Sequence, residues 1–266
     1  MLETHNRAFM YGESVFTTVR MLNGELKDWE YHFDRLRKGT EFLYGPFTDA
    51  DEWVALFKNM LETRMLSESG DRVLRITVYR EQQGRGLVRS GLISVTDLKL
   101  HLSSTHFDKL RTEGVFKLRT CPAIMRPRWW PSYLKAGNYL ETILAQKIYL
   151  TEIDDDLLFL APDDTILESS VANIFVVRHD KLFTPPPGPN VLEGVMRKKI
   201  LEVSREFFKD TEEVASRIEQ VFKADLVFGS NSVRGLFLVD HIDGNELKYS
   251  QAMLDKFEML KARVLK

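Results

Sequence analysis

Residues 132–144 read SYLKAGNYLETIL, and residues 165–175, after an acidic turn, read TILESSVANIF. The first stretch places Lys135 just before an amphipathic segment that we predict to be a helix over residues 138–150. The second places Glu168 at the end of one short predicted strand, with another predicted at 172–177. One lysine and one glutamate, each beside an apolar element, therefore form the candidate site from which we interpret the rest of the chain.

These two residues match the needs of a carbonyl cofactor that has a basic ring nitrogen. A lysine amine condenses with an aldehyde in its uncharged form, which burial and cationic neighbours favour. A glutamate facing a pyridine nitrogen keeps that nitrogen protonated, so the ring can withdraw the electron pair left when a bond at the substrate's amine-bearing carbon breaks. Taken alone, Lys135 could also be a solvated charge at a helix start, and Glu168 could cap a turn.

The composition predicts a globular cytoplasmic protein of one or two domains. The chain has 266 residues, 44% hydrophobic and 29% charged, and shows no apolar run of about 20 residues and no secretory leader. Its single cysteine, Cys121, agrees with a reducing compartment. The net charge of −2 argues against a nucleic-acid partner, and the six histidines show no metal-ligand spacing. We therefore expect no nucleic acid, membrane or metal as partner.

The first half predicts an α+β unit. The β-branched run SVFTTVRM is followed by Asn23-Gly24, a strong hairpin signal. Helical spacing begins at Tyr31, and Thr48 with Asp51 resembles the capping box of a second helix. Further strands are predicted at 72–80 and 92–100, separated by a polar loop at 81–86.

The second half predicts a larger domain that contains the candidate site. Strands are expected at 115–120, 156–160, 225–229 and 236–240, with helices at 194–208 and 251–265. The apolar alternation typical of a strand is interrupted at the polar residues Ser103-Ser104-Thr105. We therefore divide the chain into an N-terminal α/β domain at 1–102, a linker at 103–112 and a C-terminal domain at 113–266.

Five short motifs in order resemble those of the fold-type IV pyridoxal-phosphate enzymes. They are HFDRL at 32–36, LKAGN at 134–138, ESSVANIF at 168–175, GVMR at 194–197 and a small polar turn before IDG at 242–244. Each motif is weak, but five at suitable spacings over most of the chain are specific. The resemblance implies a two-domain α+β fold, with a smaller α/β sandwich and a larger C-terminal pseudo-barrel that binds pyridoxal 5'-phosphate.

The resemblance also implies roles for individual residues. Lys135 would form the imine with the cofactor and then move protons, Glu168 would hold the pyridine nitrogen, and Asn173 would lie at the cofactor. The remaining implied ligands surround the cofactor phosphate: Arg35, the backbone N–H groups of Val195 and Met196, and Ser232. A helix start after Gly194 would suit an anion on physical grounds, because its first N–H groups lack partners and carry the positive end of the helix dipole.

Small sequence features favour one branch of the family, the 4-amino-4-deoxychorismate lyases. The stretches FTTVR at 16–20, REQQGRG at 80–86, GVMR and SVRG at 232–235 are similar to those of the lyases. Leu87 stands where the D-amino-acid aminotransferases have a carboxylate-binding histidine, and the spacing in KAGNY argues against the branched-chain enzymes. An aminotransferase acting on D-amino acids, branched-chain amino acids or amines remains the alternative, and a catalytically inactive relative is a third possibility.

In the lyase interpretation, Lys135 removes the proton from the amine-bearing ring carbon, and pyruvate leaves to give 4-aminobenzoate. Thr17 or Thr18 would assist with a proton. Arg85 and Arg234 are the candidates for binding the substrate's carboxylates, since arginine binds a carboxylate in two-pronged fashion. Both arginines could instead be solvated loop residues. The resemblance further implies a homodimer.

Overall fold

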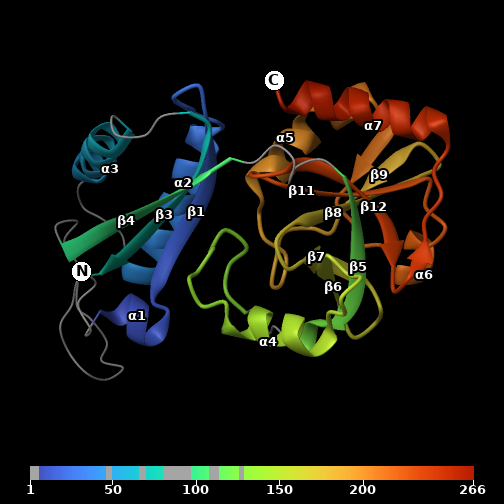
Figure 1. The fold of residues 1–266 in the computed structure, drawn as a ribbon, viewed down its shortest axis with the longest axis horizontal. Coiled ribbons are helices and arrows are strands. Elements are labelled where there is room, and N and C mark those ends of the chain that lie inside the picture. The colour runs from blue at the N-terminus through green and yellow to red at the C-terminus, as the bar shows by residue number, and fades with distance from the viewer. Residues whose placement is uncertain (1–5, 46–49, 66–69, 81–96, 108–113, 126–128) are drawn as a thin grey trace. The chain divides into compact units, whose positions relative to one another are not determined.

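We describe the chain from a computed structural model, over residues 6–45, 50–65, 70–80, 97–107, 114–125 and 129–266. The chain divides into two compact units, which we treat separately (Figure 1). The first comprises Met1–Phe107 and also Tyr133–Tyr139, and the second comprises Asp108–Ser132 and Leu140–Lys266. The short segment that carries Lys135 thus belongs with the first unit, although it lies between two segments of the second.

The first unit is built on a four-stranded antiparallel sheet in the order β2-β1-β3-β4. One face of β1 and β3 is apolar and buried, with Val15, Val19, Leu74 and Ile76 at 1% exposure or less. Helix α2 packs against β1, and Leu36 is buried with it. The elements are α1 (Arg7–Tyr11), β1 (Ser14–Leu22), β2 (Glu25–Leu26), α2 (Trp29–Tyr44), α3 (Ala50–Met65), β3 (Arg72–Arg80) and β4 (Leu98–His106).

Most elements predicted in this unit are present. The Asn23-Gly24 turn joins β1 and β2, and both residues have the positive φ that this tight turn requires. Strand β3 has the predicted bounds, whereas Thr48 lies outside the described residues. Strand β4 runs through Ser103–His106, where the sequence predicted a linker, because it pairs with β3 along its whole length. Lys99, His101, Ser103 and Thr105 alternate along its exposed side.

The second unit is built on a nine-stranded sheet that closes on itself. The order β8-β11-β12-β5-β6-β7 returns to β8 through a β7–β8 pairing, so six strands form a closed circuit, with β9 and β10 extending from β8. The strands are β5 (Val115–Pro122), β6 (Asp156–Leu160), β7 (Ile166–Ser169), β8 (Asn173–Arg178), β9 (Lys181–Phe183), β10 (Asp210–Glu212), β11 (Leu226–Asn231), β12 (Gly235–Ile242) and β13 (Asn245–Glu246).

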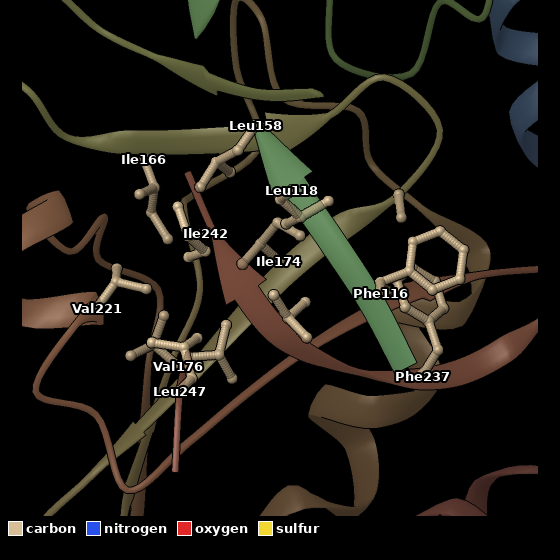
Figure 2. Packing of buried hydrophobic residues seen from close by; sticks show 13 residues of the cluster. Phe116, Leu118, Leu158, Ile166, Ile174, Val176, Val221, Phe237, Ile242 and Leu247 are labelled. Atoms are coloured by element: carbon tan, nitrogen blue, oxygen red, sulfur yellow. The ribbon is translucent and has the colours of Figure 1, made fainter. Parts of the chain in front are cut away.

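The interior of this circuit is filled by one apolar cluster that draws side chains from all six of its strands (Figure 2). The ring centres of Phe116 on β5 and Phe237 on β12 lie 4.2 Å apart, and Ile174 and Val176 of β8 are fully buried. Ile174 and Val176 point into this core, while Phe175 and Val177 between them belong to a second cluster, so β8 is buried on both faces and reads as a continuous apolar run. The predicted α+β fold with a C-terminal pseudo-barrel is confirmed.

A second apolar cluster binds helices to the outside of the barrel. The stacked rings of Phe175 and Phe228, on paired strands, lie 4.9 Å apart and contact Met196 of α5 and Phe257 of α7. Helix α5 ends at Val203 and continues as a 3-10 turn, η4, rather than as the helix predicted to reach residue 208. The helices of this unit are η3 (Ala123–Met125), α4 (Leu140–Tyr149), α5 (Val195–Val203), η4 (Ser204–Glu206), α6 (Ile218–Val221) and α7 (Gln251–Val264).

Among the helices described, none combines the length and apolar character that crossing a bilayer requires.

Candidate active site

In the first unit, the segment that carries Lys135 lies along β1. The N–H of Phe16 donates to the Lys135 carbonyl at 2.9 Å, and the N–H of Gly137 donates to the Ser14 carbonyl at 2.8 Å. This antiparallel pairing places the Lys135 side chain on the same side of the sheet as Phe16. A Cβ at Gly137 would come within 2.1 Å of the Ser14 hydroxyl, so a larger residue there would force the Ser14 side chain to move.

The Lys135 amine is held among aromatic rings. Its Nζ donates to the Tyr139 hydroxyl at 3.0 Å and lies 4.9 Å from the centre of the Phe16 ring. The Phe16 and Tyr139 rings meet edge to face, with their centres 5.6 Å apart. Lys135 is therefore not a solvated charge on a helix surface, and its amine is oriented by a hydroxyl group and a ring face.

Arg75, which the sequence analysis did not single out, lies on the same side of the sheet. It is paired with Thr18 in the β1–β3 ladder, and its guanidinium carbon is 3.5 Å from the centre of the Phe16 ring. Phe16 thus contacts both a guanidinium and the Lys135 amine. The available signal was the alternation of RVLRITVYR, in which Arg75 falls among residues that point away from the apolar face.

Arg35 and Thr17 meet on the opposite, helix-covered side of β1. Arg35 Nη2 donates to Thr17 Oγ1 at 3.1 Å, and the same hydroxyl lies 2.7 Å from Nδ1 of His32, one turn earlier on α2. All three residues are buried, and Thr17 is fully so. Burial, followed by the positive charges of Arg35 and Lys135, lowers the pKa of His32 well below its usual value of 6.5. His32 is accordingly neutral around pH 7.

In the second unit, Glu168 is a buried carboxylate that accepts hydrogen bonds from Leu192 and Asn173. Its Oε2 accepts the N–H of Leu192 at 2.6 Å and a longer bond of 3.4 Å from Asn173 Nδ2. Asn173 also donates to the Leu192 carbonyl at 2.8 Å. Strand β7 contains one extra residue where it pairs with β6, between Ile166 and Ser169. Bulges of this kind commonly re-aim side chains next to functional sites.

The start of α5 lies beside Asn173. Gly194 is the N-cap of α5 and provides no side-chain cap for the first N–H groups. A Cβ at Gly194 would fall 2.1 Å from Asn173 Oδ1, so only glycine allows this approach. Val195 and Met196, which begin the helix, are both buried. The positive end of α5 therefore lies next to the strand end that begins at Asn173.

Ser230 extends this group of polar residues to a third strand. It stands directly opposite Asn173 in the β8–β11 ladder, so the two side chains lie on the same side of the sheet. Its hydroxyl is buried and has no hydrogen-bond partner among the described residues. Ser232, the serine predicted from the sequence, lies two residues later in the turn between β11 and β12. In that turn Asn231 accepts from the N–H groups of Val233 and Arg234.

The predicted site residues thus fall into two groups, one in each unit. The first group contains Lys135, Arg35, Thr17 and Thr18, and the second contains Glu168, Asn173, Val195, Met196 and Ser232. Of the two predicted substrate residues, Arg85 lies outside the described residues. Arg234 stacks on Phe116, with its guanidinium carbon 4.3 Å from the ring centre.

An amine attachment point, a buried acid and a helix start are the groups through which proteins use pyridoxal phosphate. The family Amino-transferase class IV matches residues 14–242, and the chain belongs to it. It is a pyridoxal-phosphate-dependent enzyme, a lyase or an aminotransferase.

Three known proteins illustrate the similarity. The chain is 27% identical over 248 residues to an aminodeoxychorismate lyase of Vibrio harveyi, covering 91% of this chain and 88% of the relative. It is 22% identical over 251 residues to a D-alanine aminotransferase of Bacillus licheniformis, covering 92% and 84%. Its fold matches the pyridoxal-phosphate-bound form of a hypothetical aminotransferase from Mycobacterium tuberculosis with a TM-score of 0.79, at 18% identity, covering 100% and 93%.

The residues of the second unit fit this cofactor. A phosphate accepts hydrogen bonds, and the unpartnered Ser230 hydroxyl together with the uncapped N–H groups of α5 are donors that can supply them. A protonated pyridine nitrogen pairs with an acid, and Glu168 is buried in this same group. When bound, the cofactor supplies an aldehyde and an electron-withdrawing ring. Each of the residues above can bind or orient one part of it.

Proposed function

We propose that the protein is a 4-amino-4-deoxychorismate lyase, which releases pyruvate to give 4-aminobenzoate. The observation that carries this proposal is the arrangement around Phe16: the Lys135 amine lies over its ring, while Thr18 and Arg75 are paired beside it on the same side of the sheet. A base, a hydroxyl and a guanidinium on one surface are what proton removal, leaving-group protonation and carboxylate binding require. The similarity to the Vibrio harveyi lyase supports the same assignment.

Lys135 has two roles in this proposal. It would hold the cofactor covalently, and its freed amine would act as the base at the substrate's amine-bearing carbon. The hydrogen bond from its Nζ to the Tyr139 hydroxyl orients the amine, which would otherwise rotate through many conformers. Tyr139 is thus a positioning residue for Lys135.

We assign the Thr18 hydroxyl as the proton donor to the departing pyruvate. Thr17 and Thr18 are both candidates from the sequence, but the Thr17 hydroxyl is already bound by Arg35 and lies next to His32. Thr18 is half-buried and lies on the same side of β1 as Phe16. Because Thr18 lies on that side, it can donate its proton without breaking the hydrogen bonds that Thr17 makes with Arg35 and His32.

The remaining roles concern binding. We propose that Glu168 binds the pyridine nitrogen, that Asn173 keeps Glu168 in place, and that Arg35, Ser232 and the N–H groups of Val195 and Met196 bind the phosphate. Ser230 joins this phosphate group, since its buried hydroxyl needs a partner. Arg75 joins Arg85 and Arg234 as a candidate for the substrate's carboxylates.

Product analysis tests the lyase directly. The enzyme is incubated with aminodeoxychorismate, and 4-aminobenzoate and pyruvate are measured, beside a panel of amino donors. We expect both products in equal amounts, and roughly tenfold to hundredfold slower release in Thr18→Val, with Thr18→Ser close to wild type. Failure to form either product would remove the lyase assignment.

An aminotransferase is the second candidate, because Lys135 and Glu168 would serve both reactions and the chain resembles the D-alanine aminotransferase of Bacillus licheniformis. In a single turnover with D-alanine or a branched-chain amino acid, an aminotransferase converts its cofactor fully to the amine form, which has a different absorbance. The lyase should do so slowly or not at all. Rapid conversion together with absence of 4-aminobenzoate would establish the alternative.

We also propose that the enzyme is a cytoplasmic homodimer. Helix α4 exposes Leu140, Ile143, Leu144 and Ile148, which recur at helical spacing and form one apolar stripe. Such a stripe is typical of a surface that another protein covers. Light scattering gives the mass in solution, and Ile143→Glu with Ile148→Glu should shift it to that of a monomer. A wild-type monomer would contradict the dimer.

A further inference from the structure

The Thr17 hydroxyl connects His32 to Arg35. Thr17 and His32 come from different elements, β1 and α2, yet Oγ1 and Nδ1 are only 2.7 Å apart. Arg35 Nη2 lies 3.1 Å from the same oxygen. His32 is 1% exposed and Thr17 is 0% exposed, so water does not compete for these bonds.

The hydrogen-bonding capacity of a hydroxyl gives this chain of contacts a direction. A hydroxyl has one proton and two lone pairs, so Thr17 can accept from Arg35 and donate its own proton to Nδ1 of an imidazole that carries no proton there. His32 meets this condition, because burial and the nearby Arg35 and Lys135 charges keep it neutral. In this state Arg35 donates to the Thr17 hydroxyl, and that hydroxyl donates to the His32 imidazole. The second hydrogen bond fixes the direction of the Thr17 O–H, and with it the orientation of the lone pair that accepts from Arg35.

We propose that His32 is a positioning residue for Arg35, acting through the Thr17 hydroxyl so that the guanidinium is held ready for the phosphate of the cofactor. The inference rests on the proposed function in one respect, namely that Arg35 binds that phosphate. His32 does not contact the cofactor in this scheme. Its contribution is to reduce the conformers that the long Arg35 side chain must lose on binding.

The test compares two ligands that differ only in the phosphate. The full-length protein is freed of cofactor, and its dissociation constants for pyridoxal phosphate and for pyridoxal are measured. His32→Leu, which removes the acceptor, should raise the dissociation constant for pyridoxal phosphate roughly tenfold and leave that for pyridoxal unchanged. His32→Asn, which keeps an acceptor near the Nδ1 position, should restore most of the affinity.

A second pair of variants tests the connecting hydroxyl. Thr17→Val removes the hydroxyl at nearly constant shape, and Thr17→Ser keeps it. We expect the valine variant to behave like His32→Leu and the serine variant to behave like wild type. If His32→Leu does not fold, as judged by circular dichroism, the Thr17 pair decides the question by the same criteria.

The Arg35→Gln background separates this inference from the function on which it rests. If Arg35 binds the phosphate and His32 acts through it, Arg35→Gln weakens pyridoxal phosphate selectively, and adding His32→Leu changes little further. An unchanged affinity in Arg35→Gln refutes the phosphate role itself. Suppose that Arg35→Gln selectively weakens the binding of pyridoxal phosphate, so that the phosphate role of Arg35 stands. The positioning role of His32 is then overturned if His32→Leu raises the dissociation constant by the same factor with Arg35 and with Gln at position 35. It is also overturned if His32→Leu raises the dissociation constants for pyridoxal phosphate and pyridoxal equally.

Discussion

Glu168 and Asn173 lie opposite each other in the β7–β8 ladder, and both bind the same residue, Leu192. Glu168 accepts the Leu192 N–H at 2.6 Å, and Asn173 donates to the Leu192 carbonyl at 2.8 Å. The connector between β9 and α5 is thereby fixed to the barrel at the residue pair that carries the acid. The orientation of Glu168 and the position of the α5 start thus depend on one set of contacts.

Glu168→Gln should separate the charge of this residue from its structural contacts. Glutamine can still accept the Leu192 N–H, so we expect the variant to fold, with a melting temperature close to that of wild type. Its neutral amide cannot keep the pyridine nitrogen protonated, and turnover should fall roughly hundredfold or more.

Glu168→Asp is the matched control, because it keeps the charge and shortens the reach, and it should retain more activity than the glutamine variant. Steady-state product formation measures both. Wild-type turnover in Glu168→Gln would show that the acid has another role.

Gly194→Ala should disturb the α5 start. The added methyl would fall 2.1 Å from Asn173 Oδ1, which forces the helix start and the amide apart. We expect weaker binding of pyridoxal phosphate, by roughly tenfold or more, because the helix N–H groups would be displaced from the phosphate.

Gly188→Ala is the control on the same connector, since a methyl there has no neighbour within 4 Å. Its affinity for the cofactor should equal that of wild type. Equal affinities in the two alanine variants would place the phosphate away from α5.

The stability of the protein should depend on pH through His32. Its pKa is lowered in the folded protein, so the unfolded chain takes up a proton at a higher pH than the folded one does. This contribution is fully present above about pH 6.5 and is lost as the pH falls below that value, by up to about 1.4 kcal/mol per pH unit.

Urea unfolding of the wild type and of His32→Asn at several pH values between neutral and mildly acidic measures this term. The wild type should lose more stability on acidification than the variant does. Parallel pH dependences would mean that the imidazole titrates normally in the folded state.

Much of the fold could be predicted because it depends on local patterns. The alternation in residues 72–80 and the short apolar run at 157–160 are visible in the sequence, and strands form at those positions. The extension of β4 to His106 was missed because Ser103 and Thr105 are weak strand signals by themselves, and pairing with β3 decides their structure. Likewise, only backbone pairing with Phe16 reveals that Lys135 belongs with the first unit.

Candidate site residues could be proposed from the sequence where they lie in a motif. Residues whose importance depends on a three-dimensional contact could not. Lys135, Glu168 and Arg35 stand in recognisable motifs. His32 is a lone histidine on a helix, and its position beside Thr17 depends on how α2 packs on β1. Ser230 becomes notable only because its hydroxyl is buried opposite Asn173, and Arg75 only because it stacks on Phe16.

The proposed function depends most on the covalent attachment of the cofactor at Lys135. The wild-type protein is loaded with pyridoxal phosphate, reduced with borohydride, digested and analysed by mass spectrometry, with Lys135→Ala treated in parallel. We predict the reduced cofactor on the peptide that contains Lys135 and no label in the alanine variant. Label on another lysine, or none on the wild type, would contradict the proposed role of Lys135.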